Sequence, residues 1–283
     1  MPLSLVPSTP PRLLRSGSAA GAWNMALDEA LMRRASREPE TTPWVLRFYR
    51  WSPPCLSLGR HQCLSRDPNA RLEEPIIRYQ CLCAEKGIDL VRRATGGRAI
   101  LHYHELTYSL VVPEAGVDVV ASYRALSEGL RLGLRRLGLE AEFGHAQGKA
   151  LASRENCFSI SARADLLVDG VKVVGSAQMR TAHALLQHGS IPVDRDAELE
   201  RLIYGVEDPA QAAPSLRELL GRVVGMEEME EALLAGFTET WGVAPAESSP
   251  TPDELLDTHR LMKLKYARDA WTWRGDAEAA AEG

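Results

Sequence analysis

The sequence predicts an α+β fold in which a mixed β-sheet core is packed with helices. Short alternating strands dominate its first two thirds. One long amphipathic helix over 118–137 interrupts them, and three helices follow near 214–221, 226–240 and 252–268. Segregation of strands from helices is typical of α+β architecture, whereas a parallel α/β sheet needs regular alternation of the two.

The N-terminal half is expected to hold one helix and several short strands. Trp23, Leu27 and Leu31 recur at helical spacing, which predicts a helix over about 22–36 with its apolar stripe in the core. Pro53 and Pro54 interrupt the extended structure that follows. The other elements expected in this half are strands over 44–50, 55–58, 88–93, 98–102 and 106–112 and a helix over 78–86.

The long central helix has both of its end signals in the sequence. Asp118 is a favoured N-cap residue, and Gly138 stands where a left-handed residue ends a helix. Arg124, Arg131 and Arg135 follow one another at near-helical spacing and form either a solvated face or a landing surface for an acidic carrier protein.

A β-hairpin is expected around Asp169 and Gly170, because this dipeptide separates two alternating segments, 164–168 and 171–174. The polar, glycine-punctuated stretch 144–156 before it is expected to be a mobile loop leading to Cys157, and a further strand fits 183–193.

The chain is expected to form a main domain over 12–243, with a helical C-terminal extension over 244–274 packed on it. Residues 1–11 and 275–283 are expected to be loose tails. At 283 residues with 45% apolar and 25% charged side chains, the chain can bury a substantial core.

Charge and hydropathy exclude several classes of function. The net charge of -5 argues against a nucleic-acid partner that is bound through phosphate neutralisation. The sequence has no apolar run of the roughly 20 residues that a membrane span needs and no signal-peptide core, so we expect a cytoplasmic protein without membrane association. Its five cysteines are an odd number and are expected to be reduced thiols.

Common nucleotide and metal motifs are absent from the sequence. There is no P-loop, no G-x-G-x-x-G after a strand and no G-x-S-x-G elbow. Cys81 and Cys83 lack a second pair at zinc spacing and fall on a predicted helix that points them to different faces, so we expect two packed thiols and no metal site.

Three features remain as candidates for chemistry. Adjacent glycines in the turn 92–98 let the backbone approach a ligand, although an ordinary tight turn with solvated arginines has the same pattern. Lys172 follows the hairpin turn and precedes the small residues of 175–177; an exposed strand lysine is the alternative. Cys157 follows the polar loop and is either a nucleophile or an inert buried thiol.

Four segments, in order, resemble the lipoate-protein ligase A and octanoyltransferase family, whose catalytic domain is related to that of biotin protein ligases. They are NMALDEAL at 24–31, RRATGGRAILH at 92–102, KVVGSAQMR at 172–180 and LQHGSI at 186–191. Residues 46–51 and 265–274 are also similar, so the resemblance covers all but the two tails. It implies the mixed-sheet fold of that family and makes 12–243 an acyltransferase catalytic domain.

The pair Cys157-Phe158 is similar to the one that carries the nucleophilic cysteine in octanoyltransferases of the LipM type, whereas ATP-using ligases carry an Arg-Asn-Asp-like stretch there. Arg163 and Ala164 depart from that pattern. The resemblance implies octanoyl transfer for lipoate synthesis, from octanoyl-acyl carrier protein onto Cys157 and then to a lysine of an apo-lipoyl domain such as the glycine cleavage H protein. No ATP or other cofactor is expected.

The residues support this chemistry in physical terms. A thioester exchanges readily onto a thiolate, and the Lys172 ammonium would stabilise the oxyanion and lower the pKa of the thiol. His102 and His188 are each as well explained by a structural hydrogen bond as by proton transfer. Besides the catalytic pair, the residues expected to bind substrate are Arg93, Thr95, Gly96, Gly97, Arg98, His102, Gly175, Ser176, Ala177, Gln178, His188 and Gly189.

Geometry sets one condition on the catalytic pair. The hairpin turn places Lys172 across from Leu167, and Cys157 lies ten residues before Leu167, about 33 Å away along a straight strand. We therefore expect the chain to bend between Phe158 and Arg163.

Three other activities fit the same residues. An ATP-dependent lipoate-protein ligase would need ATP and not Cys157, a lipoyl amidotransferase would also use a cysteine, and a non-catalytic binder would hold acylated proteins without turnover.

Overall fold

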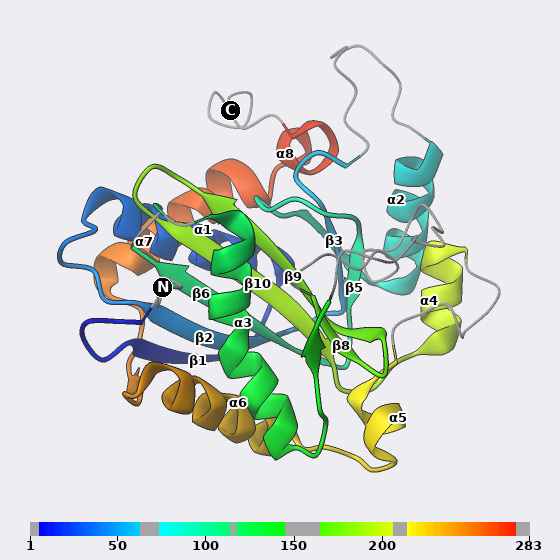
Figure 1. Cartoon of the computed structure of the whole chain (residues 1–283). Helices are drawn as coiled ribbons and strands as arrows, with labels where there is room; N and C mark the ends of the chain where they lie inside the picture. Colours follow the sequence, from blue (N-terminus) through cyan, green and yellow to red (C-terminus); the bar gives the residue numbers. More distant parts are fainter. Residues whose placement is uncertain are drawn as a thin grey trace.

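The computed structural model describes residues 6–62, 74–113, 116, 118–144, 165–205 and 214–275, and it confirms the predicted α+β fold (Figure 1). The strands are β1 (Arg12–Ala19), β2 (Val45–Trp51), β3 (Cys55–Leu58), β4 (Asp89–Arg92), β5 (Ile100–His102), β6 (Glu105–Val112), β7 (Glu142–Phe143), β8 (Leu166–Val168), β9 (Val171–Arg180), β10 (Leu185–Pro192) and β11 (Ala246–Glu247). The helices are α1 (Gly21–Arg37), α2 (Glu74–Lys86), α3 (Val119–Arg136), α4 (Ala197–Tyr204), α5 (Leu216–Leu220), α6 (Met226–Trp241), α7 (Pro252–Leu261), the π-helix η3 (Met262–Tyr266) and α8 (Asp269–Arg274).

The described strands form two sheets. The larger has eight strands in the order β11-β1-β2-β6-β10-β9-β8-β7, and the smaller has three in the order β4-β3-β5. The larger sheet is mixed, since β1 pairs in parallel with β2 and β11 whereas β6 pairs antiparallel with β2 and β10.

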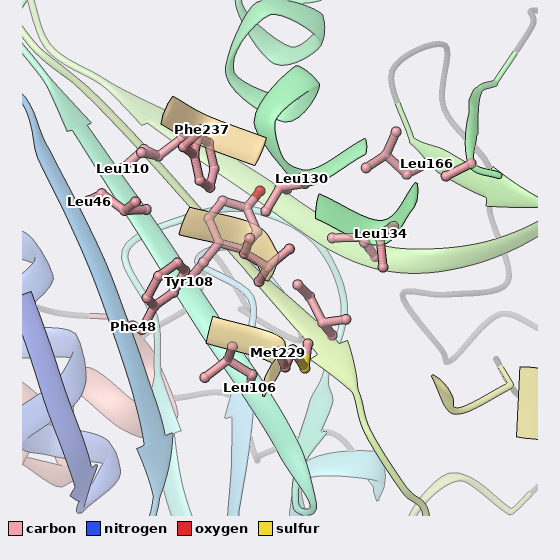
Figure 2. Packing of buried hydrophobic residues seen from close by; sticks show 14 of the residues in the cluster. Leu46, Phe48, Leu106, Tyr108, Leu110, Leu130, Leu134, Leu166, Met229 and Phe237 are labelled. Atoms are coloured by element: carbon pink, nitrogen blue, oxygen red, sulfur yellow. The ribbon is translucent and has the colours of Figure 1, made fainter. Parts of the chain in front are cut away.

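Helices α3 and α6 cover one face of the larger sheet and α1 covers the other (Figure 1). On the α3 face, side chains at alternate positions of β2 and β6 pack against Leu130, Leu134 and Phe237 (Figure 2). On the other face, Leu27 and Leu31 of α1 pack against Leu14, Val45 and Val111. The smaller sheet packs against α2 and α4.

The predicted end signals of α3 are confirmed. The Asp118 side chain accepts hydrogen bonds from the backbone N–H groups of Val120 and Ala121, and Gly138 has φ of 101° just beyond the helix. The hairpin is confirmed as well, because Asp169 and Gly170 have φ of 50° and 78°, as a type I′ turn requires, and Leu167 pairs with Lys172.

Five short or polar elements are absent from the sequence prediction: β1, β7, β11, α4 and α8. β1 carries arginine, serine and glycine and becomes a strand because β2 and β11 pair with it on either side. The helix expected over 252–268 divides into α7 and η3. The C-terminal segment also supplies β11 to the main sheet, and the division at 243/244 stays an expectation.

No helix among the described residues is both long and apolar enough to cross a bilayer.

Candidate active site

A pocket opens where the N-terminal part of α1 and the α1 face of the larger sheet meet the smaller sheet. The empty space within it is about 380 Å³, including the space open to solvent at its mouth. Met25, Tyr49, Trp51, Arg93, Ile100, His102, Thr107, Gly175, Ser176, Ala177, His188, Gly189 and Ser190 line it.

Seven of the predicted substrate-binding residues line this pocket together. They are Arg93, His102, Gly175, Ser176, Ala177, His188 and Gly189. They come from segments far apart in the sequence, and the antiparallel pairing of β9 with β10 sets Gly189 opposite Ser176 and His188 opposite Ala177. A side chain on Gly189 would not fit, because an added Cβ would lie 2.6 Å from the Gly175 carbonyl oxygen.

The other predicted binding residues lie outside the pocket lining. Thr95 is hydrogen-bonded to His188, which does line the pocket. Gly96, Gly97 and Arg98 follow Thr95 in the same loop. Gln178 donates a 2.8 Å hydrogen bond to Gln187, whose own amide donates to Ser127 of α3. Its side chain thus belongs to the α3 face, and a binding role for Gln178 stays a prediction.

His188 is held at both ring nitrogens. Nδ1 lies 3.1 Å from Asp28 Oδ2, and Nε2 lies 2.7 Å from the Thr95 hydroxyl. Asp28 is 1% exposed and also accepts hydrogen bonds from Arg47, Tyr49 and Ser109. Since a carboxylate can only accept, His188 donates from Nδ1 and accepts from Thr95 at Nε2.

His102 is held in a parallel way. Nδ1 lies 2.7 Å from Glu105 Oε1, and Nε2 lies 2.7 Å from the Ser57 hydroxyl. The Ser57 hydroxyl also accepts a 3.0 Å hydrogen bond from Arg93 Nη1. The indole of Trp51 stacks on the His102 ring with 3.9 Å between centroids.

Burial and pairing set the charge states of His188 and Asp28. Burial lowers the pKa of His188, against the opposing hydrogen bond and charge of Asp28, which keeps the imidazole neutral near pH 7. Burial alone would raise the pKa of Asp28, but the Arg47 charge and the His188 hydrogen bond bring it below its usual value. An ionised Asp28, a charged Arg47 and a neutral His188 are therefore the stable combination.

Together the two histidines anchor the 93–98 loop to the sheet. His188 reaches the loop through Thr95, and His102 reaches it through Ser57 and Arg93. The Arg93 guanidinium also donates to the carbonyls of Gly96 and Arg98 at 2.9 and 2.7 Å. These contacts favour the structural alternative for His102 and His188.

Lys172 lies on β9, three residues before Gly175, and does not line the pocket. Its ammonium is 3.1 Å from Asp165 Oδ2, and both side chains are 8% exposed. The register of β8 with β9 shifts at this point, since Leu166 pairs with Val174 but Leu167 pairs with Lys172. This register shift is a β-bulge, and both Val173 and Val174 pack in the core on the α3 face. Side chains alternate on either side of the bulge, so Lys172 and Gly175 lie on the opposite face, which is the face of the pocket.

Cys157, the predicted bend between Phe158 and Arg163, the departures at Arg163 and Ala164 and most of the predicted loop 144–156 lie outside the described residues. The two residues that flank this gap are adjacent, because Gly144 N–H donates to the Asp165 carbonyl at 2.9 Å. The predicted pairing of Cys157 with Lys172 stays a prediction.

The described cysteines do not resemble nucleophiles. Cys81 is exposed and Cys83 is buried, on different faces of α2 as predicted. Burial raises the pKa of Cys83 to about 12 and raises that of Cys55 well above its usual value. The described residues hold no cluster of three or more side chains suited to a metal ion.

Asp28, Arg47 and Glu105 are site residues that the sequence analysis missed. Asp28 falls within the segment 24–31 that carries the family resemblance, and that position was the available signal. The other two lie on strands that look like ordinary sheet segments, and their role depends on partners far away in the chain.

The three arginines of the candidate landing face on α3 make intramolecular contacts. Arg131 pairs with Glu128 and Arg135 pairs with Glu239, while the Arg124 guanidinium lies 5.3 Å from the Phe143 ring centroid. These pairs favour a solvated, structural face.

Comparison with known structures identifies the fold. A crystal structure of lipoate-protein ligase A bound with ATP superposes with a TM-score of 0.76 at 23% identity, covering 94% of this chain and 99% of that one. A bipartite lipoate protein ligase from Thermoplasma acidophilum gives a TM-score of 0.74 at 24% identity, covering 94% of this chain and 96% of its own. The fold is that of a lipoate-protein ligase catalytic domain.

Residues 20–238 match the lipoyl protein ligase A/B catalytic domain family. The octanoyltransferase LipM of Kyrpidia tusciae is 39% identical, covering 93% of this chain and 98% of the relative, and that of Bacillus subtilis is 36% identical over the same shares. The chain belongs to the lipoyl protein ligase A/B catalytic domain family and, within it, to the octanoyltransferase LipM family of acyltransferases.

Proposed function

We propose that this chain transfers an octanoyl group in two steps, from octanoyl-acyl carrier protein to Cys157 and from Cys157 to a lysine of an apo-lipoyl domain such as the glycine cleavage H protein. Neither step uses ATP or another cofactor, and we place the reaction in the cytoplasm. The observation that carries this proposal is a pocket with apolar walls on the same face of β9 as Lys172. The full-length similarity to octanoyltransferases supports it.

The pocket suits an unbranched acyl chain. Met25, Trp51, Ile100 and Ala177 supply apolar walls, and the lining residues Gly175 and Gly189 add no side chains to them. The polar floor of the pocket is already hydrogen-bonded within the protein. An apolar chain that displaces water there is favoured by about 0.8 kcal/mol for each methylene buried.

Chain connectivity allows Cys157 to reach the pocket. Cys157 lies eight residues before Asp165, so a straight continuation would carry it about 26 Å away. Strand β8 begins only at Leu166, and Gly144 and Asp165 are hydrogen-bonded to each other beside Lys172. Gly144 and Asp165, the two ends of this stretch, therefore meet beside Lys172, which supports an approach of Cys157 to Lys172.

In the first step the Cys157 thiolate attacks the thioester carbonyl carbon of the donor. The Lys172 ammonium stabilises the oxyanion, which collapses with cleavage of the bond to the carrier's sulfur, and the carrier leaves as its thiol after taking up a proton. In the second step the acceptor lysine amine attacks the acyl-enzyme. The bond to the Cys157 sulfur breaks, and the amine's proton passes to the departing thiolate.

Intact-protein mass spectrometry tests the first step directly. Wild-type protein mixed with octanoyl-acyl carrier protein without ATP should gain one octanoyl group that hydroxylamine removes, and Cys157→Ala should gain none. Cys81→Ala is the matched control, because it removes an exposed thiol outside the pocket. It should acylate like the wild type.

The other activities give different results in the same experiment. Modification of an acceptor domain by octanoate or lipoate with ATP, retained in Cys157→Ala, would show a ligase and overturn the assignment of the nucleophile. Transfer from an acylated lipoyl domain but not from the carrier protein would show an amidotransferase. Binding of acylated protein with no adduct and no turnover would show a non-catalytic binder.

A further inference from the structure

The C-terminal helix α8 is tied to the loop that carries Arg93. The indole N–H of Trp271 donates to the Arg92 carbonyl at 2.7 Å, and the Arg92 guanidinium donates back, through Nε, to the carbonyls of Trp271 and Thr272 at 3.2 and 2.9 Å. Arg92 is 0% exposed and Trp271 is 1% exposed. We refer to Arg92, Trp271 and Thr272 as the C-terminal clasp.

The same guanidinium fixes a second loop. Arg92 Nη1 donates to the carbonyls of Gly59 and Gln62 at 2.7 and 2.9 Å. This loop lies against the 93–98 loop, since Arg60 N–H donates to the Thr95 carbonyl and a Cβ on Gly59 would lie 1.9 Å from the Gly97 carbonyl oxygen. Arg92 therefore holds α8 and both loops at one point.

Arg60 closes this junction from the outer side. Its guanidinium lies 4.3 Å from the Trp271 ring centroid, and it donates to the carbonyl of Gly275 at 2.9 Å, at the end of α8.

The junction continues into the pocket wall. Arg93, the next residue after Arg92, lines the pocket and holds the carbonyls of Gly96 and Arg98. Trp271 also packs in the same apolar cluster as Met25 and Tyr49, which line the pocket from α1 and β2. A shift of Trp271 would thus reach one polar wall and one apolar wall together.

We propose that Trp271 is a positioning residue for octanoyl transfer, which sets the 93–98 loop against the acyl pocket from the C-terminal helix. The proposal rests on the proposed function for the identity of the acyl donor. Trp271 touches no reacting group, so its loss should weaken occupation of the pocket and leave the acceptor step unaltered.

Trp271→Phe tests this proposal, because it keeps an aromatic ring and removes only the indole N–H and part of the ring area. The matched control is Trp241→Phe, since Trp241 is 6% exposed in the core beside α3 and its Nε1 has no hydrogen-bond partner among the described residues. Both variants make the same chemical change at a buried position, but only one breaks the clasp.

For Trp271→Phe we expect a rise of about tenfold in KM for octanoyl-acyl carrier protein, the scale of one buried hydrogen bond. Its KM for the acceptor domain should equal that of the wild type. Trp241→Phe should keep both KM values within about twofold, because Trp241 belongs to the core cluster on the α3 face and lies outside the pocket lining. A donor KM for folded Trp271→Phe no higher than that of Trp241→Phe would overturn the proposal, as would an equal rise in both KM values.

A second variant covers the case in which Trp271→Phe does not fold. Arg60→Ala removes the contacts of Arg60 with the Trp271 ring and the Gly275 carbonyl. It should raise the donor KM about threefold, as expected for a lost cation–π contact and one hydrogen bond. An unchanged donor KM in folded Arg60→Ala would then reject the proposal.

Binding of a non-transferable octanoyl amide of pantetheine, measured by calorimetry, separates the two proposals. If wild type binds this amide but transfers nothing from octanoyl-acyl carrier protein, the proposed transfer fails, and the ratio of amide affinities in Trp271→Phe and Trp241→Phe still decides the role of the clasp. Equal affinities would overturn it.

Discussion

The two faces of the larger sheet differ in what they bury. On the α3 face, β6 presents Leu106, Tyr108 and Leu110 to an apolar core (Figure 2). The intervening residues of the same strand, Glu105, Thr107 and Ser109, face the pocket and α1 and are equally buried, but each is hydrogen-bonded. One strand thus contributes packing to one face and a polar site to the other.

This difference has an energetic consequence. The apolar face is stabilised by area and shape, so its substitutions should change stability alone. Charges on the pocket face are stable only while paired, because a buried ion without its partner costs several kcal/mol. Since the pairs on this face also hold the 93–98 loop, changes there should alter stability and transfer together.

The largest expected effect follows from breaking the central ion pair of the pocket face. Asp28→Ala leaves the Arg47 guanidinium, which is 0% exposed, without its carboxylate partner at 2.7 Å. We expect a loss of about 3–5 kcal/mol in the free energy of unfolding by urea, with a large fall in transfer by the remaining folded protein, because His188 and Thr95 lose their anchor.

Asp257→Ala is the control for this change, since Asp257 pairs with Arg37 at the surface. It should cost less than about 1 kcal/mol. Similar losses for the two variants would show that burial does not govern the pair.

The apolar face should respond differently to a substitution of comparable severity. Gly236 lies where α6 meets α3, and an added Cβ would be 2.2 Å from the Gly129 carbonyl oxygen. Gly236→Ala should lower the free energy of unfolding by about 1–3 kcal/mol through overpacking. Its kcat/KM per folded molecule should equal that of the wild type, and a specific loss of transfer would contradict the separation of the two faces.

The smallest expected effect is the contribution of His188 to the pH dependence of the free energy of unfolding. Burial lowers the pKa of His188 in the folded state, so below about pH 6.5 the unfolded chain takes up a proton that the native protein does not. The stabilisation is complete above that pH and is lost as the pH falls through the lowered value. The free energy of unfolding should therefore fall between about pH 7 and pH 5, by up to about 1.4 kcal/mol per pH unit from this residue.

Urea unfolding of wild type and His188→Asn across this range measures the contribution. The variant should show a shallower slope, and parallel slopes for the two proteins would mean that His188 titrates in the folded state as it does in the unfolded chain.

Much of the fold was predictable because its signals are local. Asp118 and Gly138 delimit α3, and Asp169 with Gly170 produces the hairpin, since capping and turn conformations depend on a few adjacent residues. β1 and β11 were not predictable, because their strand state depends on pairing across more than 200 residues.

The candidate site, like the fold, has a part that was predictable from the sequence and a part that was not. The motif around Arg93 and the segments that carry Gly175 and His188 were found by resemblance and do meet at one pocket. Gln178 lies on the opposite face of the sheet, because side chains alternate along β9. The bulge after Lys172 reverses that alternation, and no residue in the hairpin marked it beforehand.

By itself, the sequence determined the fold class, the hairpin, the ends of the long helix and the family to which the chain belongs, because each depends on short segments or on their order. Only the tertiary structure decided that Asp28 and Glu105 hold the two histidines and that Trp271 reaches the loop of Arg93. The reason is physical: burial of a polar side chain is stable only where hydrogen-bond partners replace water, and here those partners come from distant parts of the chain.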